Sequence, residues 1–306
     1  MSNHTQKKAV VTGGAGFIGS HLASALLAKG YAVAVVDDLS GGRREKVPEG
    51  AAFFELDVND TAALAPVMAD AEFVFHQAAL PRVQFSIEHP IETTRANVDG
   101  TVSVLKAAHD AGVKRVIYAA SSSAYGDQDT MPLTEDMRAE PKSPYALQKH
   151  IGELACKLFS EVYGLPTVSL RYFNVYGPGA SAEGAYALVI TKFLKQRVAG
   201  EPLTITGDGM QTRDFIHVRD IVRANILAAE SEKVGSGEVI NIGAGKNASV
   251  NRVAELIGGP VEHIALRLEP HDTLAGNTLA RELLGWEPGV TLEEGIAELK
   301  KLAGIS

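Results

Sequence analysis

The chain has 306 residues, of which 45% are hydrophobic and 22% charged. This composition is typical of a globular protein that can bury a large core, as one α/β unit or as two joined domains. Its 29 lysines and arginines stand against 37 aspartates and glutamates, which gives a formal net charge of −8. The acidic balance argues against nucleic acid or an anionic membrane as the main partner.

A single cysteine, Cys156, excludes an intramolecular disulfide framework and a thiolate metal cluster, and we expect no metal. It lies among apolar helical positions, so we expect a buried structural side chain in a protein of the reducing cytoplasm. No apolar run reaches the roughly 20 residues that cross a bilayer. Lys7 and Lys8 precede an apolar run as in a signal peptide, but the glycines that follow interrupt it. A strand, a turn and a helix explain this segment better.

The first half alternates strands with helices. We expect short apolar strands at residues 8–12, 31–36, 52–56, 73–76, 116–120 and 167–173, and helices at 20–29, 98–111 and 145–163. Such alternation predicts an α/β fold with a parallel, doubly wound Rossmann sheet in residues 1–173, completed by later segments. His76, at a strand end, is interpreted as structural rather than as a ligand.

A glycine-rich turn follows the first strand. Gly13, Gly16 and Gly19 have the spacing G-x-x-G-x-x-G, which permits a tight turn and lets backbone amides approach a pyrophosphate. The N-terminus of the helix predicted from about Ser20 then faces the phosphate charge, and Phe17 and Ile18 just before it are predicted cofactor contacts. We therefore predict a dinucleotide site at this turn.

An acidic residue ends the second strand. Asp37 lies 18 residues after Gly19, where a carboxylate accepts hydrogen bonds from the adenosine ribose and repels a 2′-phosphate. NAD is therefore favoured over NADP, although Arg43 and Arg44 leave NADP open. The predicted cofactor contacts at the strand ends also include Asp38, Ser40, Gly42, Asp57, Val58, Ala78, Ala79 and Tyr172.

The second half no longer alternates cleanly. Shorter strands are expected at 203–206, 215–218 and 239–242, with helices near 220–230, 250–256 and 278–284. Residues 174–306 are therefore predicted to form mainly a smaller mixed α/β lobe that binds the substrate. Its loops cover the carboxyl edge of the sheet, where ligands of open α/β sheets bind.

Tyr145 and Lys149 stand four residues apart, so they share one face of the predicted helix. A nearby ammonium favours the phenolate and lowers the pKa of a phenol, which makes a general acid/base. A serine from an earlier strand end can hydrogen-bond the same substrate oxygen. The helix also has an apolar stripe, which predicts a homodimer through helices 98–111 and 145–163. The stripe consists of Leu147, Ile151, Leu154, Leu158 and Val162.

Several motifs occur in one order along nearly the whole chain. They are TGGAGFIGSH, Asp37, SSSAYGD (121–127), SPYALQK (143–149), RYFNVYGP, GDGMQTRDFIHVRD and ARELLGWEP. Together they resemble the extended short-chain dehydrogenase/reductase family in its nucleotide-sugar epimerase branch. The chain is most similar to UDP-glucose or UDP-N-acetylglucosamine 4-epimerases. The resemblance implies tightly held NAD and a UDP-sugar substrate.

The resemblance also implies roles for individual residues. Ser121 matches the catalytic Ser/Thr, Tyr145 the proton shuttle and Lys149 its partner. Asn97 matches a structural or cofactor-side asparagine. The remaining substrate contacts that it implies are Ser122, Ser123, Asn174, Ala187, Leu188, Arg213, Arg267 and Thr273.

Departures from the family pattern separate its branches. Ser122 and Ser123 replace the Asp-Glu pair of dehydratases, which disfavours dehydration, and Gly179 replaces the loop arginine of glucuronate epimerases. Arg267 is one place off the family register, and Gly276 replaces an aspartate. Thr273 stands at the pocket position that is small in epimerases accepting N-acetyl sugars, which predicts that such sugars fit.

Three alternatives remain on the same fold. A UDP-glucuronate epimerase differs in its sugar, whereas a UDP-sugar reductase or decarboxylase would produce or consume NADH. A non-catalytic NAD-binding sensor is the third, but it has no need of Ser121, Tyr145 and Lys149 together.

Overall fold

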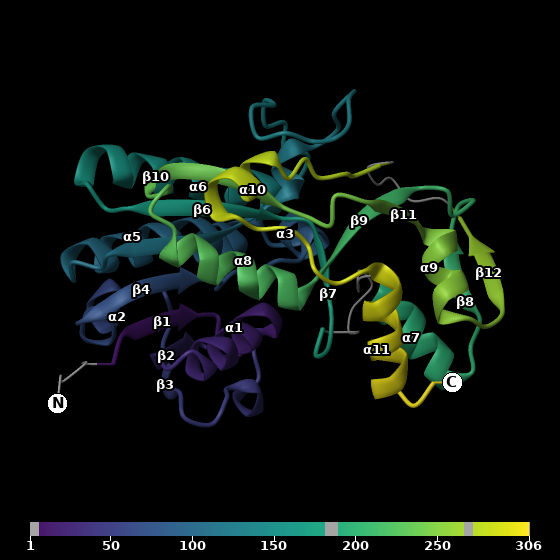
Figure 1. The fold of residues 1–306 in the computed structure, drawn as a ribbon, viewed down its shortest axis with the longest axis horizontal. Helices are drawn as coiled ribbons and strands as arrows, with labels where there is room; N and C mark the ends of the chain where they lie inside the picture. The colour runs from purple at the N-terminus through teal and green to yellow at the C-terminus, as the bar shows by residue number, and fades with distance from the viewer. Residues whose placement is uncertain (1–5, 181–188, 266–271, 306) are drawn as a thin grey trace.

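The computed structural model describes residues 6–180, 189–265 and 272–305. Within them, seven parallel strands form the main sheet in the order β10-β6-β5-β4-β1-β2-β3, which is a doubly wound Rossmann sheet (Figure 1). The strands are β1 (Lys8–Thr12), β2 (Ala32–Asp37), β3 (Ala52–Glu55), β4 (Ala71–His76), β5 (Arg115–Ser121), β6 (Thr167–Tyr172) and β10 (Ser236–Ile242). The predicted fold class is confirmed.

Helices cover both faces of this sheet. One face packs against α1 (Phe17–Ala28), α8 (Val218–Glu230) and α10 (Thr278–Leu284). The other packs against α2 (Thr61–Met68), α5 (Gly100–Asp110) and α6 (Pro144–Tyr163). The strands are apolar on both faces because each face has its own hydrophobic layer.

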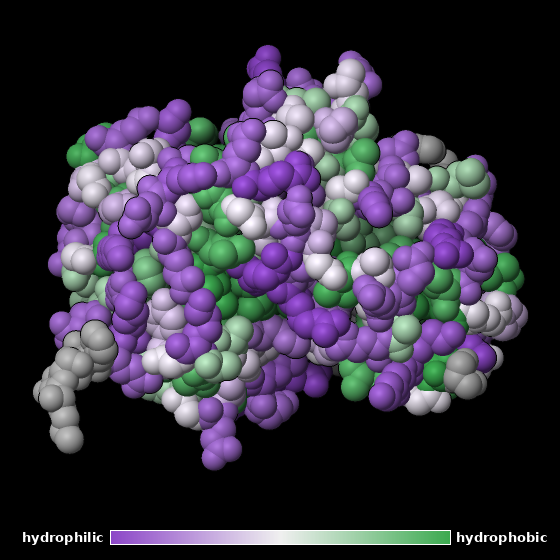
Figure 2. Space-filling view, viewed as in Figure 1, coloured by the Kyte–Doolittle hydropathy of each residue, from purple (hydrophilic) through white to green (hydrophobic). Residues whose placement is uncertain are grey.

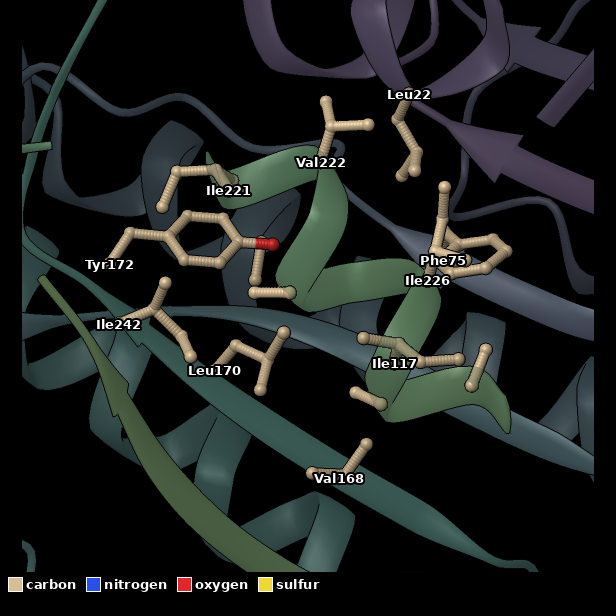
Figure 3. Packing of buried hydrophobic residues seen from close by; sticks show 14 of the residues in the cluster. Leu22, Phe75, Ile117, Val168, Leu170, Tyr172, Ile221, Val222, Ile226 and Ile242 are labelled. Atoms are coloured by element: carbon tan, nitrogen blue, oxygen red, sulfur yellow. The ribbon is translucent and has the colours of Figure 1, made fainter. Parts of the chain in front are cut away.

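Figure 3 shows the first of these layers from close by. Ile221 and Ile226 of α8 lie against Ile117 and Leu170 of the sheet, and all four side chains are at least nine-tenths buried. Burying one such side chain is worth roughly 1.5–3 kcal/mol. The Tyr172 ring lies in the same layer and turns its hydroxyl toward α8.

Glycine allows one unusually close contact behind the sheet. A Cβ at Gly152 of α6 would lie 2.2 Å from the Tyr118 hydroxyl oxygen of β5, so only glycine fits there. This contact brings the N-terminal half of α6 close to the end of β5. The predicted catalytic residues lie on these two elements.

The second lobe has its own core and lies at the right of Figure 1. It contains a sheet of β7 (Asn174–Tyr176), β9 (Thr212–His217) and β11 (Asn247–Ser249), and the pair β8 (Leu203–Thr206) and β12 (Val261–Ile264). Its helices are α7 (Val189–Ala199), α9 (Val250–Ile257) and α11 (Leu292–Leu302). β10, α8 and α10 also follow residue 173, but they belong to the layers of the main sheet.

The remaining elements are short. They are η1 (Arg44–Lys46), α3 (Val83–Glu88), α4 (Pro90–Thr94), the π-helical turn η2 (Arg95–Asp99) and η3 (Ser122–Tyr125). The helix predicted from residue 20 begins at Phe17, because Gly16 is its N-cap. The helix predicted to begin at residue 98 is α5, which begins at Gly100, directly after the π-helical turn η2. We did not predict α7 or α11.

The visible surface is largely hydrophilic (Figure 2). On the face shown in Figure 2, hydrophilic residues predominate and hydrophobic residues gather in separate groups. No helix in the described part of the chain is long and apolar enough to cross a membrane.

Candidate active site

A cavity of about 1210 Å³ lies at the carboxyl edge of the main sheet, next to β9 of the second lobe. Sites for one small ligand usually occupy about 300–1,000 Å³, so this cavity is large enough for more than one. Many predicted site residues line it: Gly13, Gly16, Phe17, Ile18, Asp37, Asp38, Ser40, Gly42, Asp57, Val58, Ala78, Ala79, Ser121, Ser122, Ser123, Tyr145, Lys149, Tyr172, Asn174, Arg213 and Thr273.

The glycine-rich turn fits a dinucleotide. Gly13 has a φ of +68°, and a Cβ there would lie 2.6 Å from the Ala78 nitrogen. Gly16 is the N-cap of α1 and offers no side chain, so the first amides of this helix remain available to a ligand. An anion at this point would also meet the positive end of the helix dipole.

Asp37 is held in place by backbone amides. Its Oδ2 accepts from Ala15 N and its Oδ1 from Leu39 N, both at 2.9 Å. Each carboxylate oxygen keeps further lone pairs for ribose hydroxyls. Burial raises the pKa of Asp37, and the two backbone hydrogen bonds oppose that shift. Together, the glycine turn and this carboxylate fit the pyrophosphate and ribose of NAD.

His76, at the end of β4, is hydrogen-bonded on both sides of its ring. His76 Nδ1 lies 2.7 Å from Thr12 Oγ1, and its Nε2 lies 3.0 Å from Thr101 Oγ1. Burial, helped by the charge of Lys149, lowers the pKa of His76 to about 3. The imidazole is therefore neutral, and both of its nitrogens are hydrogen-bonded to threonine hydroxyls, in agreement with a structural role.

The catalytic end of the cavity brings together Ser121, Tyr145 and Lys149. Ser121 ends β5, and its Oγ accepts from Ser123 N at 3.2 Å and from Ser123 Oγ at 2.8 Å. The Ser121 hydroxyl also lies near the Tyr145 phenol, and hydrogen bonding between the two groups acts to lower the pKa of the phenol. Tyr145 lies in the first turn of α6, where Ser143 accepts from Ala146 N as the helix cap.

Lys149 lies one helical turn after Tyr145 and is 4% exposed. Its Nζ donates to Ala119 O at 2.8 Å and lies 5.0 Å from the centre of the Tyr118 ring. Burial lowers the pKa of Lys149 to about 8, although Cys156 and Glu153 oppose this shift. The ammonium is therefore charged at neutral pH but close to its titration.

The expected lowering of the Tyr145 pKa is wrong for the protein without bound NAD. We expected Lys149 to lower the pKa of Tyr145, but burial raises it, and the opposing contribution comes from the hydrogen bond with Ser121. Desolvation thus outweighs this hydrogen bond. The phenol is a proton donor in this environment, and more positive charge is needed before it acts as a base.

The other end of the cavity is built around Asp214. This fully buried carboxylate accepts from the backbone amides of Ala244, Gly245 and Ala275, and burial raises its pKa to about 6. Its own amide donates to Thr273 Oγ1 at 3.2 Å, and its carbonyl accepts from Asn174 Nδ2 at 3.0 Å. Asp214 therefore positions two of the predicted substrate residues.

Asn97 does not line the cavity. Its Oδ1 accepts from Leu80 N at 2.7 Å, and its Nδ2 donates to Leu80 O and to Gln148 Oε1. The side chain thus ties the loop after β4 to α6, which is a positioning contact and not a place in the cavity wall. Ala187, Leu188 and Arg267 lie outside the described residues.

Sequence reasoning missed several residues of this site. Gln77 donates to the Tyr172 hydroxyl and to Asn225 Oδ1, both at 3.1 Å. Arg82 and Lys142 line the cavity, and Asp214 supports it. Position alone could have suggested Gln77 and Arg82, because both follow the carboxyl end of a predicted parallel strand.

Comparison with known proteins identifies the family. The profile described as "NAD dependent epimerase/dehydratase family" matches residues 9–243. A UDP-glucose 4-epimerase of Mycolicibacterium smegmatis is 37% identical over 306 aligned residues, covering 95% of this chain and 96% of the relative. This similarity spans both lobes.

Two solved structures share the fold along the whole chain. One is a UDP-N-acetylglucosamine 4-epimerase from Methanobrevibacter ruminantium, in complex with UDP-N-acetylmuramic acid. It has a TM-score of 0.91 and 37% identity, covering 97% of this chain and 99% of that one. The other is a UDP-glucuronic acid 4-epimerase from Bacillus cereus, with UDP-glucuronic acid and NAD. Its TM-score is 0.88 and its identity 32%, over 97% and 99% of the two chains. The chain therefore belongs to the NAD dependent epimerase/dehydratase family of extended short-chain dehydrogenases/reductases, with NAD as its cofactor.

Proposed function

We propose that this protein is a UDP-sugar 4-epimerase, which inverts C4 of a UDP-hexose by transient oxidation. The observation that carries the proposal is the meeting of Ser121, Tyr145 and Lys149 in one cavity wall, in the same cavity as the glycine turn and Asp37. A proton shuttle beside a dinucleotide site is the arrangement that reversible oxidation of a hydroxyl requires.

The residues of the chain then have distinct roles. Bound NAD supplies the hydride acceptor and donor for C4. Tyr145 takes the proton of the C4 hydroxyl and later returns it, while Ser121 orients that oxygen. Lys149 adds positive charge beside the phenol and helps to place the nicotinamide ribose. Between the two transfers the 4-keto sugar turns over in the pocket, and Asn174 and Arg213 hold the diphosphate.

Two observations favour epimerisation over its rivals. Ser122 and Ser123 stand where dehydratases need acidic side chains, and hydroxyl groups lack that acidity. A reductase would consume NADH and a decarboxylase would release CO2, whereas an epimerase returns the hydride within each cycle and keeps every carbon of the sugar. The three relatives compared above are all named as 4-epimerases, although of different UDP-sugars.

We expect N-acetylated sugars to be accepted. Thr273 is small, and its hydroxyl accepts from Asp214 N and Asn174 Nδ2, so the side chain is held against the wall. The measurement is NMR of the products from UDP-glucose, UDP-N-acetylglucosamine and UDP-glucuronate. Thr273→Tyr should reduce kcat/KM for the N-acetyl sugar by roughly tenfold or more relative to UDP-glucose.

Thr273→Ser is the matched control, because it keeps the hydroxyl and the small volume and should keep the N-acetyl activity within a few-fold. Wild-type protein that turns over UDP-glucose but is inactive on UDP-N-acetylglucosamine would refute the pocket assignment. Absence of C4 inversion for every sugar, or net NADH formation, would refute the proposed reaction itself.

We also propose a homodimer through α5 and α6. Leu154, Leu158 and Val162 are 54%, 51% and 64% exposed along one stripe of α6, and Val102 of the adjacent α5 is 42% exposed. A continuous apolar stripe on neighbouring helices fits the self-complementary contact of a twofold dimer.

Introducing charge into this stripe should separate the subunits. The double variant Leu154→Glu/Leu158→Glu is expected to shift the mass in light scattering from twice the 32.4 kDa of one chain to a single chain. Its circular dichroism should stay native, because both side chains point outward. Leu302→Glu changes an equally apolar, 67% exposed residue of α11 and should leave the mass unaltered. A monomeric wild type would contradict the dimer.

A further inference from the structure

The negatively and positively charged residues that line the cavity follow different strands of the main sheet. The described carboxylates of its wall are Asp37, the last residue of β2, Asp38 just after it, and Asp57 after β3, at one end of the strand order. The cations lie elsewhere and come from segments after β4, β5 and β6. They are Arg82, Lys142, Lys149 and Arg213. The catalytic end of the cavity is therefore positively charged, with no described carboxylate in its wall.

Arg82 is fixed next to the proton shuttle. It is the N-cap of α3, and its carbonyl oxygen accepts from Ser86 N at 3.0 Å. The Ser86 hydroxyl oxygen in turn accepts from Tyr145 N at 3.0 Å. These two hydrogen bonds tie the backbone of Arg82 to the first turn of α6, and Arg82 is part of the cavity wall.

Lys142 also lies next to the segments that carry the catalytic residues. It immediately precedes Ser143, the N-cap of α6. Its Cγ lies 3.3 Å from the position that a Cβ on Gly126 would occupy, so it passes beside the turn that begins at Ser121. Arg82 and Lys142 thus flank the catalytic residues, one attached to each of the segments that hold them.

Arg82 and Lys142 are both exposed, and within the described residues neither side chain has a hydrogen bond or an ion pair. The other two cations are already engaged, since Lys149 donates to Ala119 O and Arg213 donates to Thr212 O. The resemblance assigns Arg213 to the diphosphate, and the glycine turn fits the cofactor pyrophosphate. Arg82 and Lys142 therefore supply positive charge that none of these phosphates uses.

We propose that the enzyme prefers nucleotide sugars whose sugar ring carries a carboxylate, and that Arg82 and Lys142 bind this carboxylate. The proposal rests on the proposed function for the placement of the sugar beside Tyr145. An arginine and a lysine together form strong, charge-assisted hydrogen bonds with a carboxylate. A neutral hexose leaves both charges without a partner. The resemblance implies a loop arginine where this chain has Gly179, so Arg82 and Lys142 are the cavity-lining cations that can supply this charge instead.

The test uses matched pairs of ligands with the NAD-loaded protein. UDP-glucose and UDP-glucuronate differ at C6, whereas UDP-N-acetylglucosamine and UDP-N-acetylmuramic acid differ by a carboxylate-bearing ether on O3. Isothermal titration gives the Kd of each. We expect the acidic member of at least one pair to bind roughly tenfold or more tightly, with an advantage that shrinks as salt is raised. Tighter binding of UDP-glucuronate would place the bound carboxylate at C6 of the sugar, and tighter binding of UDP-N-acetylmuramic acid would place it at the O3 substituent.

Arg82→Ser/Lys142→Gln should remove most of this advantage and weaken the acidic ligand more than its neutral partner. Arg138→Gln is the control, because it removes an exposed cation of the segment before α6 that does not line the cavity. Acidic ligands that bind no tighter than neutral ones, or a double variant that weakens both members of a pair equally, would overturn the proposal. Failure of the proposed function is distinct, since it appears as an absence of C4 inversion whatever the Kd values.

Discussion

Replacing Tyr145 with phenylalanine is expected to lower kcat for C4 inversion by roughly 10²–10⁴-fold, the usual contribution of a positioned acid/base. The change deletes one oxygen at the catalytic end of the cavity and leaves the ring packed. Stability and NAD binding should therefore change little. Because hydride transfer also requires loss of the hydroxyl proton, the effect should appear in kcat more than in KM.

The measurement is the initial rate of C4 inversion by NMR, together with the thermal midpoint and an NAD titration. Tyr163→Phe is the matched control, since it makes the same chemical change at an exposed position on the same helix. It should keep wild-type kinetics. Full epimerase activity in the Tyr145→Phe protein would remove Tyr145 from the mechanism.

Arg171→Met is expected to destabilise the fold by about 3–5 kcal/mol, the cost of breaking a buried ion pair. Arg171 of β6 donates to both carboxylate oxygens of Glu153 at 2.8 and 2.7 Å, and the two residues are 4% and 2% exposed. The guanidinium also lies over the Tyr125 ring at 4.5 Å. Glu153 is one turn after Lys149, so this pair fastens the catalytic helix to the sheet.

The loss should depend on pH with a defined sign. Burial would raise the pKa of Glu153, but hydrogen bonds from Arg171 and His150 outweigh it and hold that pKa below its usual value. In the wild type this depressed pKa contributes stability at neutral pH that is lost as the pH falls. In the variant, burial of an unpaired carboxylate is relieved by protonation. The deficit of the variant should therefore shrink as the pH falls from about 7 toward 5.

Urea unfolding of both proteins at the two pH values tests this expectation. Arg281→Met breaks an ion pair with Glu287 whose side chains are both 61% exposed, and it should cost less than about 1 kcal/mol. Glu153→Leu added to Arg171→Met should recover part of the stability, because neither charge is then left buried alone. Equal losses for Arg171→Met and Arg281→Met would contradict the assigned role of the buried pair.

Local patterns in the sequence were sufficient for the parallel sheet and for the catalytic helix. The strands at 8–12 and 203–206 and the helix at 278–284 have their predicted bounds, because short apolar runs between glycines have few alternatives. The turn at Gly13 requires a positive φ, which glycine adopts readily. The four-residue spacing of Tyr145 and Lys149 places both on one face of α6. Each of these features depends on residues within about one or two turns of each other.

Other features arise only when distant segments pack. α7 and α11, whose apolar residues pack in the separate core of the second lobe, were missed, although α11 has a local signal in the capping box of Thr291 and Glu294. Asp214 becomes a buried anchor only after residues 244, 245 and 275 reach it. No spacing in the sequence relates these positions, since they are brought together by chain folding over 30 or more residues.

The glycine turn, Asp37 and the Tyr145–Lys149 spacing could thus be read from the chain alone, because each is fixed by local backbone geometry. The electrostatics of the site became visible only in the folded molecule. The structure shows that burial raises the pKa of Tyr145, that Asn97 supports the loop after β4, and that Arg82 and Lys142 flank the catalytic residues. Desolvation and long-range charge placement depend on every segment that surrounds a group, and these are properties of the packed molecule.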